Sequence, residues 1–165
     1  VALVAARDPA RWFGSVLLDK GRRHGVRRGL IGIVVQQGAR ALVGRVVEVW
    51  ENGSKLLLVS DPLFAVVASL PRTGDDGVVE GTGGPWLTMR YLSPDVEVTA
   101  GEQVVTSTRS GVYPPNLLIG RIDKRTEERV QGYAAARVRP AANLNRLFQV
   151  LLLTPAPLPS GERGG

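Results

Sequence analysis

Few side chains in this sequence have the types and spacings that catalysis requires. His24 is the only histidine, so a metal centre built from several histidines is impossible, and any acid–base role would rest on one side chain in a glycine-rich segment. Asp75 and Asp76 form the tightest carboxylate pair, but they lie between glycines, which predicts the tip of a turn. The pair gives no sign of the opposed carboxylates that glycoside hydrolysis needs.

Motifs for a nucleophile or a phosphate loop are missing as well. Ser15, Ser54, Ser107 and Ser110 lack the Gly-x-Ser-x-Gly elbow. The Gly-Thr-Gly-Gly segment at 81–84 matches neither a dinucleotide fingerprint nor a P-loop, and we predict a hairpin turn there. Cysteine is absent, which excludes a thiolate nucleophile, a disulfide and a zinc ribbon. The sequence therefore predicts no catalytic residue, no cofactor and no metal.

The charge of the chain suggests an anionic partner only weakly. Lys and Arg number 21 against 15 Asp and Glu, a formal net charge of +6, and the densest cationic segment is Arg-Arg-His-Gly-Val-Arg-Arg at 22–28. We predict that this segment is a solvated turn. A basic OB-like or SH3-like barrel that binds nucleic acid is the alternative function, but such modules stack bases on aromatic side chains. Aromatic residues make up 5% of the chain and none lies in the segment, so we predict no nucleic-acid partner.

Short strands joined by tight turns account for most of the chain. Abundant valine favours strands, and 20 Gly and 11 Pro supply the turns. Asp8-Pro9 predicts one short helical turn near the N-terminus, because Asp is a good N-cap and Pro suits the first helical position. The predicted strands are residues 1–6, 15–19, 30–36, 41–50, 55–60, 64–70, 78–80, 86–92, 103–107, 117–124, 133–139 and 147–153. Without strand–helix alternation, this pattern predicts an all-β protein.

One pattern occurs twice and predicts a duplicated β-module. The two copies are Val26, Gly29 and Leu42–Val46, and Val98, Gly101 and Leu118–Ile122. We expect the glycines of both copies to serve barrel bends and tight strand contacts. The duplication predicts two small six-stranded β-barrel-like subdomains, at 1–92 and 93–154, with strands at the ends of the first able to pair across the boundary. Residues 155–165 are predicted to form a disordered tail.

A proline-containing segment is the one place where we predict contact with a partner protein. Its candidate interaction residues are Val112, Tyr113, Pro114 and Pro115. The two prolines stiffen the loop and hold the preceding residue extended, which would present Val112 and Tyr113 in a fixed geometry. A rigid loop with an aromatic tip loses little entropy on docking. A barrel corner that needs a fixed bend explains the same residues, so both interpretations stay open.

Several short motifs, taken in order, resemble the rod shape-determining protein MreC family. They are Arg7-Asp8-Pro9 with Trp12-Phe13, Asp19-Lys20-Gly21 with Gly25-Val26 and Gly29, Leu42-Val43-Gly44-Arg45-Val46, Ser54-Lys55, Asp61-Pro62, Arg90-Tyr91-Leu92, Gly111-Val112-Tyr113-Pro114-Pro115 and Leu118-Ile119-Gly120-Arg121. The resemblance runs from Val4 to about Leu153, and the order and spacing make it specific. Ser107–Gly111 and Asn116 depart from the glycines usual in the family, which leaves the conformation of that loop open.

The resemblance implies a protein of the bacterial cytoplasmic membrane with a short cytoplasmic start, one transmembrane helix, a coiled coil and two extracytoplasmic β-barrel-like subdomains. This sequence is similar to the last region alone. The implied function is a non-enzymatic scaffold of the cell-wall elongation machinery that maintains rod shape. The implied partners are the transpeptidase PBP2, the glycosyltransferase RodA, MreD, the MreB system and further copies of the protein itself. The implied location is the periplasm, with an inner-membrane anchor absent from this sequence.

Overall fold

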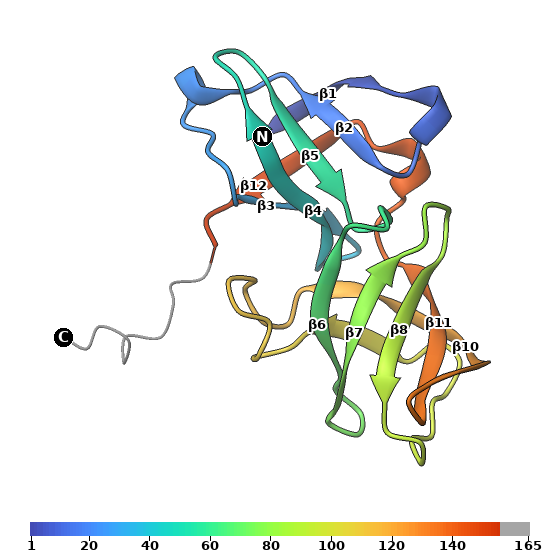
Figure 1. Ribbon diagram of the computed structural model, residues 1–165. Helices are drawn as coiled ribbons and strands as arrows, with labels where there is room; N and C mark the ends of the chain where they lie inside the picture. Colours follow the sequence, from blue (N-terminus) through green and yellow to red (C-terminus); the bar gives the residue numbers. More distant parts are fainter. Residues whose placement is uncertain (156–165) are drawn as a thin grey trace.

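The computed structural model describes residues 1–155 and consists almost entirely of strands (Figure 1). Every predicted strand is present among these residues. The strands are β1 (Ala2–Arg7), β2 (Ser15–Leu18), β3 (Ile31–Gln36), β4 (Ala39–Val49), β5 (Ser54–Leu58), β6 (Ala65–Leu70), β7 (Asp75–Gly81), β8 (Leu87–Leu92), β9 (Gln103–Thr106), β10 (Leu118–Val130), β11 (Tyr133–Pro140) and β12 (Gln149–Leu153). Three short 3₁₀ turns accompany them, namely η1 (Pro9–Arg11), η2 (Arg22–His24) and η3 (Leu144–Arg146). The Asp8 side chain caps η1 by accepting a hydrogen bond from Ala10 N, as the Asp8-Pro9 pair predicts.

The strands close into two six-stranded barrels, which confirms the predicted fold class. In the first barrel the order is β4-β3-β12-β1-β2-β5, and the β4–β5 hairpin closes the ring. In the second the order is β11-β8-β7-β6-β9-β10, and the β10–β11 hairpin closes it. A short parallel contact between β10 and β4, at Leu118 and Ala41, joins the two. Figure 1 shows the first barrel above the second, with the chain passing between them from β5 to β6.

Strand pairing crosses the predicted boundary at residue 92 more extensively than the sequence indicates. β8 pairs with β11, and β6 pairs with β9, so β6–β8 belong to the same ring as β9–β11. β12 returns to the first barrel, where it lies between β1 and β3. A division by strand pairing alone would therefore fall between β5 and β6, with β12 added to the first part. The two-subdomain limits at 92 and 93 stay a prediction.

The duplicated pattern corresponds to matching backbone hydrogen bonds in the two barrels. Gly29 N donates to Val46 O at 2.9 Å, and Gly101 N donates to Ile122 O at 2.8 Å. The reciprocal bonds, Val46 N to Leu30 O and Ile122 N to Glu102 O, are 2.8 and 2.9 Å long. In each barrel, these two bonds join the turn that contains the first glycine of the pattern to the strand that contains the second glycine, which is β4 or β10. The sequence repeat is a structural repeat.

The second glycine of each copy lies where two strands approach closely. A Cβ atom on Gly44 would overlap the carbonyl oxygen of Leu57 in β5, and one on Gly120 would overlap that of Arg139 in β11. Backbone atoms cannot move aside as a flexible side chain can, so these positions require glycine. The expectation of tight strand contacts is confirmed at both glycines. They stand in the two hairpins that close the barrels.

Two strands are longer than the sequence predicts. Asp75 and Asp76 do not form a turn tip, because they begin β7 and pair with Leu70 and Ser69 of β6. The Asp76 carboxylate accepts a hydrogen bond from Ser107 Oγ at 3.3 Å. β10 likewise continues to Val130, beyond the predicted end of that strand at residue 124. Polar residues extend both strands because cross-strand hydrogen bonding continues where one face is solvated. The predicted tail lies outside the described residues apart from Pro155.

An aromatic contact fills the space between the barrels. Phe64, which follows β5, is fully buried, and its ring lies 5.9 Å from the ring of Tyr113. The Arg45 guanidinium of β4 lies 5.7 Å from the centre of the Phe64 ring. Burial raises the pKa of the Tyr113 hydroxyl from its ordinary value of 10.0 to about 12, although Arg45 opposes the shift. The junction therefore combines an apolar contact with a phenol that is costly to ionise.

The close approach at Gly120 predicts that Gly120→Ala is strongly destabilising. The methyl group would push β10 away from β11 at the hairpin that closes the second barrel. We expect a loss of at least about 2 kcal/mol in the free energy of unfolding, measured by urea denaturation. Gly84→Ala is the matched control, since only the Thr82 hydroxyl lies within 4 Å of its Cβ, at 3.9 Å. Equal stability of the two variants would contradict the account.

The buried phenol predicts a loss of stability in alkali. A tyrosine whose pKa is higher in the folded than in the unfolded chain stabilises the fold fully below the unfolded pKa of 10.0, and this contribution disappears as the pH rises toward about 12. We expect the free energy of unfolding to fall over that pH range, and Tyr113→Phe to flatten the fall. Ultraviolet difference absorbance should show one late-titrating tyrosine in the wild type. Identical pH profiles for the variant and the wild type would exclude this role of Tyr113.

Candidate protein-interaction surface

The segment from Ser107 to Asn116, which we call the proline loop, is held by the buried Thr106 at the end of β9. Thr106 Oγ1 donates to Pro114 O at 2.6 Å and accepts from Leu117 N at 2.9 Å. The Thr106 backbone adds two bonds, from its N–H to Leu117 O at 2.9 Å and from Asn116 N to its carbonyl at 3.0 Å. Ser110 Oγ donates to Tyr113 O inside the loop. These bonds anchor the loop to the end of β9.

The proline loop presents a different side chain from the one expected. Tyr113 is only 7% exposed because its ring fills the junction beside Phe64, so the expectation of an aromatic tip fails there. Val112 is 40% exposed, Pro115 is exposed and Pro114 is half-buried. Asn116 adopts a φ of 67°, in the left-handed region, so the loop ends in a left-handed turn. A contact through this loop stays a prediction, and it would rest on Val112 and Pro115.

The structure brings together an exposed apolar surface that sequence analysis misses. Ala5, Ala6, Trp12 and Phe148, which we call the edge patch, line one hollow of about 320 Å³ on the first barrel. Phe148 is 69% exposed and Trp12 is 37% exposed, and both alanines are exposed. Exposure of a large aromatic to this extent costs hydrophobic free energy in the isolated protein, and such surfaces often bind other proteins.

Arg7 fixes the Trp12 side of the edge patch. Its guanidinium lies 4.2 Å from the centre of the Trp12 ring, and its Nε donates to Trp12 O at 2.8 Å. Arg7 Nη2 also donates to Leu144 O, and Trp12 Nε1 donates to Asn145 O at 3.3 Å. These bonds join η1 to η3, two segments far apart in the sequence. Burial lowers the pKa of Arg7 below its ordinary value, because desolvation penalises the charged form.

The edge patch borders an open strand edge. β1 and β12 pair only at Ala2–Val150 and Leu3–Gln149, and one more bond runs from Val4 N to the O of Phe148, the residue before β12, at 2.8 Å. Beyond it, Ala6 and Arg7 pair with β2 on one side, and no strand within residues 1–155 pairs with them on the other. Unpaired strand edges can accept a strand from another chain. The surface therefore offers apolar side chains beside a strand edge with which no other strand in the described residues pairs.

No local signal in the sequence singles out Phe148 or Trp12. Phe148 lies in an apolar run that becomes β12, where Val150 is buried and Phe148 is not, and only the pairing with β1 decides which side is covered. Trp12-Phe13 gives no indication of which ring is exposed. In the described part of the chain, no cluster of three His, Cys, Asp or Glu side chains could hold a metal ion. Nor does any helix there have the length and apolar character to cross a membrane.

A family model and curated proteins of one name match most of this chain. The family model described as "Rod shape-determining protein MreC, barrel core" matches residues 4–154. A protein of Cereibacter sphaeroides named cell shape-determining protein MreC is 31% identical over 89% of this chain, which covers 45% of that protein. The protein of the same name from Listeria monocytogenes is 28% identical over 92% of the chain and 52% of its own length. The chain thus spans about half the length of these relatives.

Solved structures share the fold. The crystal structure of MreC from Pseudomonas aeruginosa has a TM-score of 0.82 and 27% identity, covering 93% of this chain and 97% of that one. A complex between penicillin-binding protein PBP2 and MreC from Helicobacter pylori contains a chain with a TM-score of 0.68 and 18% identity, covering 92% of this chain and 93% of that one. The two barrels, the resemblance of the motifs and the match over residues 4–154 lead to one conclusion: the chain belongs to the rod shape-determining protein MreC family.

Proposed function

We propose that this chain is a non-enzymatic extracytoplasmic scaffold of the bacterial cell-wall elongation machinery, and that it helps to maintain rod shape. Membership of the MreC family supports the role in cell shape. The observation that carries the scaffold function is the edge patch, in which an aromatic side chain 69% exposed adjoins an open strand edge. A surface of this kind suits a protein partner better than a small substrate.

The proposed principal partner is the transpeptidase PBP2. The solved complex of PBP2 with a Helicobacter pylori MreC of the same fold supports this partner. We propose that PBP2 contacts the edge patch with apolar side chains and extends β1 with a strand of its own. Val112 and Pro115 of the proline loop are a second candidate contact. RodA, MreD and the MreB system are proposed as further members of the assembly through the rest of the protein.

Self-association is proposed as the other property of this scaffold. A chain of the same fold is described as the major periplasmic domain of a cell shape-determining filament, with a TM-score of 0.70 and 20% identity. In this chain, the open edge of β1 could pair with the same edge of a second copy. The description of that domain as periplasmic also supports an extracytoplasmic location, and a membrane anchor outside this sequence is part of the proposal.

The edge patch predicts that Phe148→Ser weakens the binding of a PBP2 ectodomain. Loss of a large aromatic at the centre of an interface costs about 2 kcal/mol or more, so the dissociation constant should rise at least about thirtyfold. Calorimetric titration of the purified domains measures the change. The fold should persist because Phe148 is 69% exposed, and circular dichroism verifies it.

Leu63→Ser is the matched control, since Leu63 is 77% exposed but lies in the turn between β5 and β6. Val112→Ser in the same titration measures the contribution of the proline loop. Unchanged binding by the Phe148 variant, with weaker binding by the Leu63 variant, would place the interface elsewhere. Sedimentation of each variant at rising concentration shows separately whether self-association uses the edge patch.

A further inference from the structure

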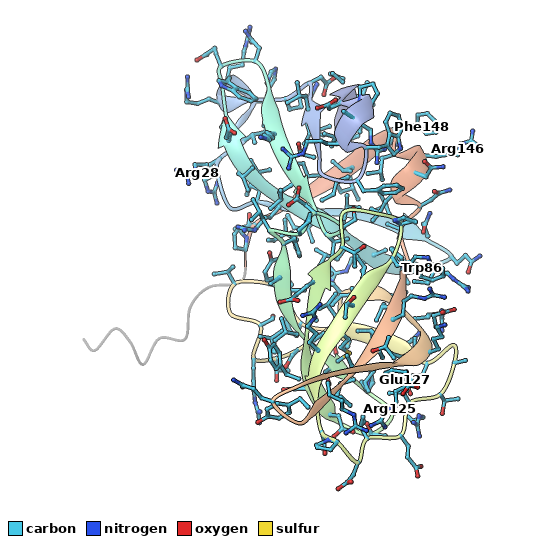
Figure 2. The ribbon with its side chains drawn as sticks, turned by 45° about the vertical axis from the view of Figure 1, so that its right-hand side comes forward. Arg28, Trp86, Arg125, Glu127, Arg146 and Phe148 are labelled. Carbon is cyan, nitrogen blue, oxygen red and sulfur yellow. The ribbon has the colours of Figure 1, made fainter. Side chains whose placement is uncertain are left out.

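The arginine-rich segment lies beside an exposed tryptophan, a proximity that the sequence does not indicate. The η2 turn packs against the tip of the β4–β5 hairpin at one end of the first barrel (Figure 1). We call Arg22, Arg23, Arg27, Arg28 and Trp50 the basic platform. The four arginines are exposed, and Trp50 is 46% exposed. Arg22 and Arg23 lie at the hairpin tip with Trp50. Arg28 lies farther down the same side of the first barrel, next to Gly29, whose N–H donates to Val46 O of β4 (Figure 2).

Backbone hydrogen bonds fix the η2 turn of the basic platform against the hairpin. Arg22 N donates to Trp50 O at 2.7 Å, and Arg23 N donates to Glu51 O at 3.1 Å. The Ser54 hydroxyl, which is buried, donates to Lys20 O at 2.8 Å. A Cβ on Gly21 would overlap the Trp50 carbonyl oxygen, so the turn lies directly against the hairpin. Little backbone entropy is lost when such a preformed turn binds a ligand.

The positive charge of the basic platform is only partly neutralised. The nearby carboxylates each pair with one cation: Asp19 with Lys20 at 3.8 Å, Glu51 with Arg22 at 3.5 Å, and Glu48 with Lys55 at 3.4 Å. Arg23 Nη1 donates to the uncharged Asn52 side chain. Among the described side chains, no carboxylate pairs with Arg23, Arg27 or Arg28. Three exposed guanidinium groups of this segment are therefore not neutralised by a carboxylate.

We propose that the basic platform docks on the surface of an anionic lipid bilayer, with the arginines on headgroup phosphates and Trp50 at the headgroup level. Guanidinium groups bind phosphate through paired hydrogen bonds, and basic side chains near an anionic bilayer are attracted electrostatically. Tryptophan is enriched at membrane interfaces because its ring is apolar and its N–H is polar. This inference goes beyond the proposed function and does not depend on it.

The shape of the site favours a bilayer over a soluble polyanion. Proteins that bind single-stranded nucleic acid use a groove with several aromatic side chains, whereas the basic platform is a protruding hairpin and turn with one. The platform also leaves the edge patch accessible. Figure 2 shows Arg28 on one side of the first barrel and Arg146 and Phe148 on the other. A bilayer and a protein partner could therefore be bound at the same time.

The test is co-sedimentation of the chain with vesicles made of equal parts phosphatidylcholine and phosphatidylglycerol. We expect binding that weakens as salt is raised and is absent with pure phosphatidylcholine vesicles. The double variant Arg27→Gln and Arg28→Gln should lower the partition coefficient about 25-fold, since each basic residue near an anionic surface contributes about fivefold. Trp50→Ala should weaken binding while leaving its salt dependence unchanged.

The charge-matched control is Arg109→Gln with Arg121→Gln, two exposed arginines of the second barrel. An equal loss in this control would mean that only net charge matters and would overturn the proposal, as would the absence of binding to the mixed vesicles. Single-stranded DNA and inorganic polyphosphate are tested at the same salt. Tighter binding of either than of the vesicles, by the wild type but not by the double variant, would assign the platform to a soluble polyanion instead.

Discussion

Both barrels depend on a point where two paired strands lie too close together for any side chain to fit between them. At Gly44 and at Gly120 the central strand of each module lies against the carbonyl oxygen of the neighbouring strand, within the hairpin that closes the ring. A ring of six strands is small, so its strands must tilt and coil strongly to close. Closure pairs most backbone groups inside each barrel. The surface left for binding consists of loops, hairpin tips and the few places where a strand loses its partner.

The strands were predictable because their signals are local. Runs of β-branched and alternating apolar residues lie between turns that Gly, Pro and Asn specify, and these features do not depend on the tertiary fold. The start of β7 at Asp75 and the end of β10 at Val130 were not predictable, because polar residues there continue strands through cross-strand bonds. The pairing of β8 with β11 was hidden for a related reason, since long-range partners leave no mark on a local pattern.

The interaction surface was less predictable than the fold. Tyr113 and Phe148 are both aromatic residues in apolar or proline-rich surroundings, but one is 7% exposed and the other 69%. The difference arises from residues distant in the sequence, because Phe64 covers the first ring and the separation of β1 from β12 uncovers the second. The same limit applies to Trp50, which meets the arginine-rich turn only through the hydrogen bonds between η2 and the β4–β5 hairpin.

The first barrel therefore carries two surfaces of opposite chemistry on different sides. The edge patch exists because β12 is five residues long and leaves β1 before its end, while the basic platform exists because η2 is anchored to a hairpin tip. Neither surface interrupts the ring of paired strands that closes the first barrel. The second barrel supplies a loop that Thr106 anchors through both its hydroxyl and its backbone. A duplicated barrel that keeps the glycines at its close strand contacts can thus present different binding surfaces in each copy. A scaffold that binds several partners needs this property.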